Sequence, residues 1–364
     1  MSGNNIIERV LIIGSQGYLG SRLTPYLIEK GFDVSCYDTG FFKDGIISPV
    51  TKHKTLKKDA RLLNLDDFKG FDAVILLAGI SNDPFGKLSS AQIYDPTLTY
   101  ALKIAKFCKS LKIKFIFPSS CSVYGATSAS GLLSETSKTN PQTPYSLNKV
   151  QIEDGLKDLA NETFSPIALR FGTVYGMSPR IRFDVVINML CGLALTSKKI
   201  TLNSDGQAWR PHLHIDDACE ALACCLDNEI KTDGLLVLNV GRNEDNYKIL
   251  EIAKIVKSNV AGAELSFLGS GSDKKEVELI KDRKIQDGVD TRTYKVSFDR
   301  IKSKLPKFRC KWNVEAGIKD LIDQLIKVPL NKEIFGQRQF YRLQQIEYLH
   351  SSGKIDNDLY WVKK

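Results

Sequence analysis

A short apolar run followed by three spaced glycines constrains the fold of this chain more than any other feature. The run at residues 10–13 predicts a strand over residues 7–13 that is buried on both faces. The sequence GSQGYLG follows at residues 14–20, and residues 17–30 have the apolar spacing of a helix that ends at Gly31. Glycines in such a turn let the backbone approach a diphosphate, whose charge is met by the helix N-terminus. The spacing is GxxGxxG, and it predicts a dinucleotide-binding strand, turn and helix.

An acidic residue follows at the position where this kind of unit contacts a ribose. A second strand at residues 32–37 ends in Asp38, 18 residues beyond Gly20. Its carboxylate can accept hydrogen bonds from the adenosine ribose hydroxyls. A 2′-phosphate there would meet a like charge, and no arginine occurs in the following residues 39–42. The sequence therefore favours NAD over NADP.

A tyrosine and a lysine four residues apart provide candidate chemistry. Tyr145 and Lys149 are separated by one helical turn, so their side chains share a face and the ammonium can lie near the phenol. A free tyrosine titrates near about 10 and is a poor base at neutral pH, but a nearby positive charge favours the phenolate. Together with the glycine turn, the pair indicates proton exchange with a sugar hydroxyl during hydride transfer.

With these residues in view, the chain resembles the extended short-chain dehydrogenases/reductases of the NAD-dependent epimerase/dehydratase family, whose members mostly act on nucleotide-activated sugars. The resemblance runs from about residue 7 to about residue 325. It is also carried by KDAR at 58–61, LLAG at 76–79, PSSCSVYG at 118–125, LRFGTVYG at 169–176 and WRPHLHIDD at 209–217. The family implies an α/β fold, a Rossmann-type doubly wound parallel sheet with a smaller C-terminal substrate-binding lobe.

The resemblance implies NAD as the cofactor and assigns residues to its site. A strand at 54–60 presents Asp59 and Ala60 where family members meet the adenine, and the strand at 71–79 ends in small residues that let the backbone pass close to the cofactor. The expected cofactor-binding residues are Gly14, Gly17, Tyr18, Leu19, Gly20, Asp38, Asp59, Ala60, Leu77, Ala78, Gly79, Tyr145 and Lys149. The family's catalytic Ser/Thr matches Ser120, which follows a strand at 113–117, so the expected catalytic residues are Ser120, Tyr145 and Lys149.

The two residues that follow Ser120 discriminate among the family's reactions. Dehydratases of nucleotide sugars have an Asp–Glu pair where this chain has Cys121 and Ser122, because elimination of water needs a further acid and base. The resemblance therefore favours an NAD-dependent nucleotide-sugar epimerase that acts at C4 through a transient 4-keto intermediate. A nucleotide-sugar 4-dehydrogenase or 4-ketoreductase is the alternative, and a non-catalytic NAD-sensing or scaffolding protein is a third hypothesis.

The second half of the chain is expected to hold the nucleotide-diphosphate sugar. Arg210 and Arg292 match family arginines that reach the nucleotide and the diphosphate, and a guanidinium fork suits phosphate oxygens. The loop at 80–86 suits either a plain turn or a sugar contact. The expected substrate-binding residues are Asn82, Ser120, Thr173, Arg180, Arg182, Arg210 and Arg292.

Composition agrees with a soluble enzyme. The 364 residues carry a net charge of +9 without a basic and aromatic array, so we expect attraction for an anionic substrate and no nucleic-acid partner. No apolar run approaches the roughly 20 residues of a membrane span, and no signal peptide precedes the first strand, which predicts a cytoplasmic protein without a membrane partner. The eight cysteines show no metal-binding spacing, so no metal is expected. A homodimer is a family expectation.

The predicted organisation has three parts. Residues 1–176 form the NAD-binding Rossmann domain, to which a segment around 205–245 is expected to return, and residues 177–330 form most of the nucleotide-sugar-binding lobe. A helix is predicted from about residue 96 to 110. Residues 331–364 form a helical extension beyond the resemblance, in which residues 340–349 have helical apolar spacing.

Overall fold

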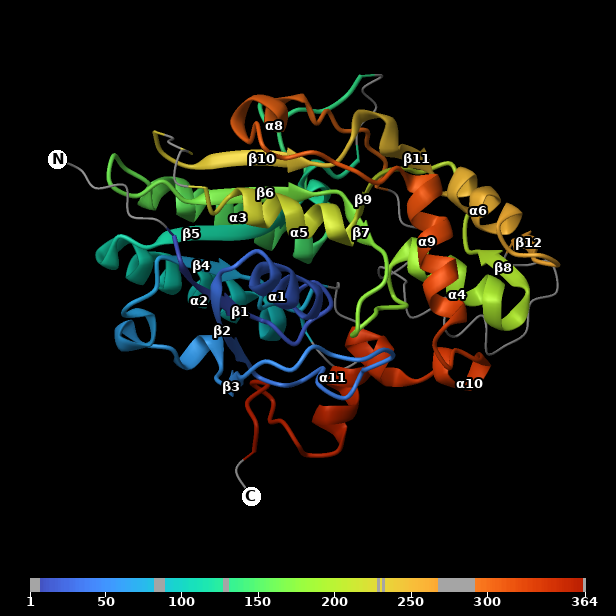
Figure 1. Cartoon of the computed structure of the whole chain (residues 1–364), viewed down its shortest axis with the longest axis horizontal. Helices are drawn as coiled ribbons and strands as arrows, with labels where there is room; N and C mark the ends of the chain where they lie inside the picture. Colours follow the sequence, from blue (N-terminus) through green and yellow to red (C-terminus); the bar gives the residue numbers. More distant parts are fainter. Residues whose placement is uncertain are drawn as a thin grey trace.

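A seven-stranded sheet forms the centre of the molecule (Figure 1). The structure is a computed structural model that describes residues 7–81, 89–126, 131–227, 230, 233–267 and 292–362. The strands run in the order β10-β6-β5-β4-β1-β2-β3, and every neighbouring pair is parallel. Their bounds are β1 Arg9–Ile13, β2 Asp33–Asp38, β3 Thr55–Lys57, β4 Ala73–Leu76, β5 Lys114–Ser120, β6 Ile167–Phe171 and β10 Leu236–Val240. The direction of the strand order reverses at β1 and β4, where α/β sheets bind ligands.

Helices cover both faces of this sheet and confirm the predicted doubly wound fold. On one face, α2 (Ser90–Leu111) and α3 (Pro144–Leu159) pack on β1, β4 and β5 through residues such as Ile104 and Ile152. On the other face, α1 (Gly20–Glu29), α5 (Ile215–Cys224) and α8 (Asp299–Lys304) pack through residues such as Leu23 and Leu222. The strands are buried on both faces because helices lie on each side, which explains their continuous apolar sequences.

A smaller lobe lies beyond the carboxyl ends of the main strands. Its helices α4 (Val186–Ser197), α6 (Ile249–Ser258) and α9 (Val314–Ile326) share one apolar core. Two small sheets complete it: β8 (Lys199–Leu202) with β12 (Glu264–Phe267), and β7 (Thr173–Tyr175) with β9 (Trp209–His214) and β11 (Asn246–Lys248). The chain thus crosses between the two lobes several times, and a domain boundary near residue 176 stays a prediction.

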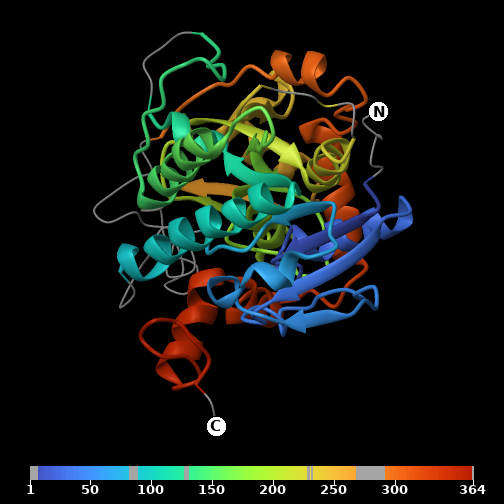
Figure 2. The same ribbon diagram turned by 90° about the vertical axis from the view of Figure 1, so that its left-hand side faces the viewer.

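The remaining elements are short or lie near the C-terminus. Single turns of 3₁₀-helix occur at η1 (Ala60–Leu62), η2 (Leu65–Phe68), η3 (Cys121–Tyr124), η4 (Asn243–Asp245) and η5 (Arg338–Phe340). The last part of the chain contains α10 (Lys332–Phe335) and α11 (Arg342–Ser351), and Figures 1 and 2 show α11 on the lower side of the molecule, in red. Within the described ranges, no helix is long and apolar enough to span a membrane.

One helix boundary differs clearly from the sequence prediction. The helix predicted from residue 96 begins at Ser90, because Ser89 accepts a hydrogen bond from the Gln92 amide and the Gln92 side chain accepts one from Ser89. This capping box starts the helix two turns before Pro96. Proline commonly marks a first helical turn, and here it lies inside the helix instead. The strand predicted at 54–60 is also shorter, since η1 begins at Ala60.

Candidate active site

A cavity of about 560 Å³ lies at the carboxyl ends of the main strands and extends into the smaller lobe. Apart from Arg180, every described residue that the sequence assigned to the site lines this cavity. Asn82 lies outside the described residues. The cavity therefore joins the glycine turn, the Tyr145 helix and the arginines of the second half in one continuous space.

The glycine turn has no room for side chains at two of its three glycines. Gly14 has a φ of 99°, and a Cβ there would lie 2.5 Å from the Ala78 nitrogen. A Cβ on Gly20 would lie 2.3 Å from the Gly14 oxygen, whereas one on Gly17 would meet the same oxygen at 3.4 Å. Gly14 and Gly20 are thus required by the fold itself. Gly17 has space in the protein and can take a close approach by a ligand.

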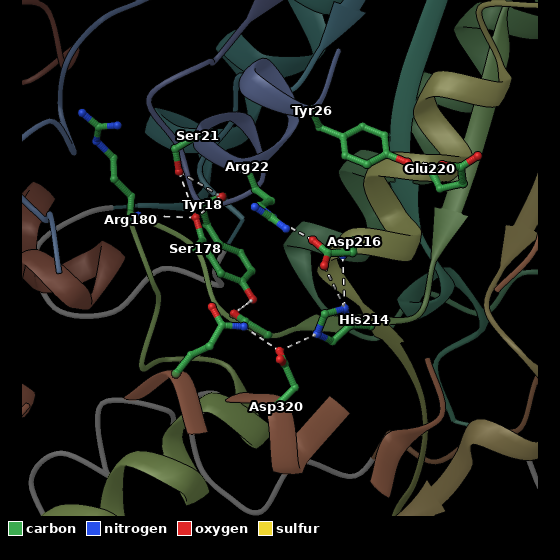
Figure 3. Close-up of polar contacts among 12 residues, drawn as sticks. Tyr18, Ser21, Arg22, Tyr26, Ser178, Arg180, His214, Asp216, Glu220 and Asp320 are labelled. Atoms are coloured by element: carbon green, nitrogen blue, oxygen red, sulfur yellow. Dashed lines mark hydrogen bonds and ion pairs between the residues drawn. The ribbon is translucent and has the colours of Figure 1, made fainter. Parts of the chain in front are cut away.

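Polar contacts hold the start of α1 against the smaller lobe (Figure 3). The Tyr18 hydroxyl donates to the Gly176 oxygen at 2.8 Å, and Ser178 Oγ donates to the Tyr18 oxygen at 2.7 Å. Further along the helix, Arg22 pairs at 2.7 Å with Asp216 on α5, which packs on the same face of the main sheet as α1. No side chain caps the first turn of α1, and its N-terminal residues line the cavity. The dipole of a helix favours negative charge at this end.

Asp38 lies at the end of β2 with both carboxylate oxygens facing backbone donors. The amides of Gln16 and Gly40 donate to it at 2.8 and 2.7 Å. Burial raises the pKa of Asp38, while these two amides and the charges of Arg180 and Arg342 act in the opposite direction. The carboxylate is thereby fixed beside the glycine turn, as a ribose acceptor requires.

The adenine end of the predicted cofactor site is formed by Asp59 and Ala60. The Asp59 carboxylate accepts hydrogen bonds from the amide and Nε of Arg61, both at 2.9 Å. Ala60 begins η1 and is buried. Asp59 is therefore already engaged by Arg61, which also donates to the oxygen of Leu359 in the C-terminal segment at 2.9 Å.

Ser120, Tyr145 and Lys149 all line the cavity. Ser120 ends β5, and its Oγ accepts a hydrogen bond from the Ser122 amide at 3.1 Å. Tyr145 is in the first turn of α3, which Thr143 caps, and the Lys149 ammonium lies 5.6 Å from the centre of its ring. The Lys149 Nζ donates to the Pro118 oxygen at 2.8 Å. Burial lowers the pKa of Lys149 to about 8. The ammonium is therefore mostly protonated at neutral pH and loses its proton slightly above it.

A buried ion pair fixes α3 to the sheet behind these residues. Glu153 on α3 accepts hydrogen bonds from Arg170 on β6, the shortest at 2.6 Å, and another from Ser119 at 2.5 Å. The Glu153 and Arg170 side chains expose only 6% and 7% of their surface. The ion pair joins the helix of Tyr145 and Lys149 to β6, and the Ser119 hydrogen bond joins the same helix to the strand of Ser120. Glu153 could not be identified from the sequence, because its partner lies 17 residues away on another element.

The smaller lobe contributes positive charge to the cavity. Arg182 pairs with Asp184 at 2.8 Å and, against the effect of burial, lowers the pKa of that carboxyl to about 2. Arg210 on β9 donates to the backbone oxygens of Trp209 and Arg292, so Arg210 and Arg292 lie side by side. Thr173 begins β7 on the same side.

Arg180 is the one described candidate that does not line the cavity. Figure 3 shows its side chain pointing away from the polar group around Tyr18. Its Nη2 lies 3.5 Å from the Lys43 oxygen, and its Nε is buried without a hydrogen-bond partner. The sequence predicted phosphate contacts from both Arg180 and Arg182, since residues two apart in an extended chain face the same side. A turn at residues 179 and 180 breaks that alternation, and only Arg182 lines the cavity.

Further residues that were not predicted as site residues line both sides of the cavity. Ser122 lines it, and its buried Oγ has no hydrogen-bond partner. Residues 201–204, at the end of β8 and beyond, line the side of the smaller lobe. Arg342 and Leu359 reach it from the C-terminal segment. The sequence of that segment shows only apolar residues at helical spacing, and this pattern does not reveal which part of the protein the helix packs against.

The residues present fit a dinucleotide cofactor. An uncapped helix start behind a glycine turn, a carboxylate at the end of the next strand and a lysine beside a tyrosine line one cavity in the order that a dinucleotide would need. Within the described part of the chain, no group of three or more histidine, cysteine or acidic side chains could hold a metal ion.

Comparisons with known proteins agree with this geometry. A UDP-glucose 4-epimerase of Lactobacillus helveticus is 27% identical over 272 residues, which cover 68% of this chain and 81% of that protein. A dTDP-D-glucose 4,6-dehydratase of Dictyostelium discoideum is 27% identical over 238 residues, 59% of this chain and about half (54%) of that protein.

Solved structures extend the likeness over most of the fold. A UDP-glucose 4-epimerase from Thermotoga maritima, solved with UDP-glucose, matches with a TM-score of 0.72 and covers 88% of this chain and 99% of its own. At 20% identity this match shows the fold alone. The family model for the NAD-dependent epimerase/dehydratase family matches residues 10–241. This chain therefore belongs to the NAD-dependent epimerase/dehydratase family of extended short-chain dehydrogenases/reductases, enzymes whose cofactor is NAD.

Proposed function

We propose that this protein is a nucleotide-sugar epimerase that inverts C4 through a transient 4-keto intermediate. One observation carries the proposal: Ser120, Tyr145 and Lys149 line a single cavity together with the glycine turn and with Arg210 and Arg292. A nucleotide sugar held by its diphosphate at the arginines would place its sugar at the tyrosine.

Each residue of the trio has a distinct role in this mechanism. Tyr145 takes the proton of the C4 hydroxyl, and Ser120 donates a hydrogen bond to the same oxygen as it becomes a carbonyl. Lys149 keeps positive charge near the phenol, at 5.6 Å from the ring centre. When bound, NAD supplies the acceptor for the C4 hydrogen and its return. The proton goes back from Tyr145 after the keto sugar has turned its other face, so no net oxidation occurs.

The acidic residues of the cavity favour epimerisation over dehydration. Elimination of water needs an acid and a base in addition to the tyrosine. Cys121 is 1% exposed and donates to the Arg170 oxygen rather than facing the cavity, and Ser122 offers only a hydroxyl. The described carboxylates of the cavity wall, those of Asp38, Asp59 and Asp184, all accept hydrogen bonds from backbone amides or arginines.

Proton NMR of the purified protein with UDP-, dTDP-, GDP- and CDP-sugars would test the proposal. We expect one of these sugars to convert to its C4 epimer with no net change in NAD. Product that forms only with stoichiometric use of NAD or NADH would make the protein a 4-dehydrogenase or 4-ketoreductase instead. No conversion of any sugar, with NAD bound, would favour a sensing or scaffolding role.

Tyr145→Phe tests the central residue separately. Removal of the hydroxyl should lower turnover by about 10²–10⁴-fold, the usual size of an acid–base contribution, and leave NAD affinity nearly unchanged. Single-turnover kinetics and calorimetric titration with NAD would measure the two effects. Unchanged turnover in this variant would remove Tyr145 from the mechanism.

The proposal includes a cytoplasmic homodimer, which rests on the family resemblance. Sedimentation equilibrium at micromolar concentrations would determine the mass, for which 40.7 kDa is the monomer value. Cell fractionation would test the location.

A further inference from the structure

The C-terminal residues 341–362 lie over the cofactor half of the cavity. Figures 1 and 2 show α11 and the chain after it beside β3 and the segment that follows β2. Ile346, Leu349, Ile355 and Leu359 form an apolar cluster with Phe41 and the start of α2, and Tyr145 packs against this cluster. The segment is therefore joined to the walls of the site and is not a separate appendage.

Hydrogen bonds hold this segment to the elements that line the cofactor site. Trp361 Nε1 donates to the Thr39 oxygen at 2.7 Å, and Gln345 Nε2 donates to the Phe41 oxygen at 3.0 Å. From the other side, Arg61 Nη2 donates to the Leu359 oxygen. Hydrogen bonds to backbone oxygens thus join the C-terminal segment to the loop after β2 and to the start of η1. They fix the position of the segment relative to both.

Arg342, at the start of α11, brings a charge into the cavity. The residue is 5% exposed and lines the cavity, and its Nη2 is buried without a hydrogen-bond partner. Its guanidinium lies 4.2 Å from the centre of the Phe42 ring, and its backbone amide donates to Asp184 at 3.1 Å. Burial, reinforced by the nearby charge of Arg182, lowers the pKa of Arg342 to about 9, so the side chain remains charged at neutral pH.

The position of Arg342 identifies the ligand that it can meet. On one side its charge acts on Asp38, the predicted ribose acceptor, and on the other side it acts on Asp184 and Arg182, which lie toward Tyr145. A dinucleotide that spans from Asp38 to Tyr145 must pass its diphosphate between these two groups. A buried cation with an unused hydrogen-bond donor destabilises a protein unless an anion accepts a hydrogen bond from that donor.

We propose that Arg342 binds the diphosphate of NAD, so that the C-terminal segment completes the cofactor site. This rests on membership in an NAD-dependent family and on the predicted cofactor residues, and it is independent of the reaction at C4. Arg342 donates from Nη2 to a phosphate oxygen while α1 meets the other side of the diphosphate with its N-terminus.

Calorimetric binding to cofactor-free protein tests this role without an activity measurement. The probes are adenosine, ADP, NAD and NADP, and the variants are Arg342→Met and Arg342→Lys. We expect Arg342→Met to weaken the binding of ADP and NAD by about 10–100-fold, the contribution of a charge-assisted hydrogen bond, and to leave the affinity for adenosine unchanged. Arg342→Lys should recover part of the affinity. The matched control is Arg338→Met, because Arg338 is an exposed arginine just before this segment and stacks on Tyr348 of α11.

Thermal unfolding separates ligand binding from a structural role. Since the charge of Arg342 has an unused donor, Arg342→Met in the cofactor-free protein should be at least as stable as the wild type. Equal losses for adenosine and ADP, or unchanged affinity for all four probes, would overturn the proposal. A loss confined to NADP would assign Arg342 to a 2′-phosphate instead. Failure to epimerise any sugar would refute the proposed function and leave this binding result standing.

Discussion

Replacement of Glu153 by methionine tests how the catalytic helix is held against the sheet. The carboxylate accepts hydrogen bonds from Nε and Nη2 of Arg170, and from Ser119. Without it, the buried guanidinium keeps the Tyr124 hydroxyl as a neighbour but loses its charged partner. Removing one member of a buried ion pair costs about 3–5 kcal/mol, so we expect Glu153→Met to lower the free energy of unfolding by about this amount.

The double variant decides whether the cost comes from the uncompensated charge. Arg170→Met should also destabilise, but Glu153→Met combined with Arg170→Met should cost at least about 2 kcal/mol less than the sum of the two single effects. Glu153→Gln keeps the shape and one acceptor oxygen and should be intermediate. Urea unfolding followed by circular dichroism and by tryptophan fluorescence would measure these energies. Single effects below about 1 kcal/mol, or strict additivity, would refute the reasoning.

Two further predictions concern the glycine turn and the buried histidines. Gly20→Ala should destabilise the cofactor-free protein by more than about 2 kcal/mol because its Cβ would lie 2.3 Å from the Gly14 oxygen, whereas Gly17→Ala, at 3.4 Å, should retain stability and weaken only NAD binding. Thermal unfolding without NAD compares them, and equal shifts would contradict the argument. Burial lowers the pKa of His212 to about 3 and of His214 to about 4, so between about pH 6.5 and pH 4 only the unfolded chain takes up these protons. Stability should therefore fall with decreasing pH by about 1.4 kcal/mol per pH unit for each histidine, and His212→Phe should remove one such contribution from urea unfolding between pH 6 and 4.5.

The parts of the site that could be predicted from the sequence are those in which local order fixes geometry. A strand, a glycine turn and a helix place Gly14, Gly20 and Asp38 by their spacing alone, because each element constrains the next. Tyr145 and Lys149 share a helix face for the same reason. The parallel sheet and its two helix layers follow from alternating strand and helix patterns.

The parts that could not be predicted depend on contacts between distant segments. The predicted start of α2 was wrong because Pro96 resembles a residue of a first helical turn, while the capping box at Ser89 is the stronger signal. Whether an arginine faces a cavity depends on the turn of its backbone, and Arg180 and Arg182 differ in this respect. Arg342 reaches the cavity only because an amphipathic helix packs on a loop about 300 residues earlier in the chain.

The contacts of residues 341–362 also have a consequence for the order of synthesis. The bond between Trp361 and Thr39 spans 322 residues. At a typical rate of about 5–20 residues per second, the ribosome completes the later segment some 15–60 s after the loop that follows β2. During this interval Phe41 lacks its apolar cover, and the nascent chain offers a hydrophobic surface that chaperones can bind. A chain that stops before residue 341 would retain this exposed surface permanently and would be prone to aggregate.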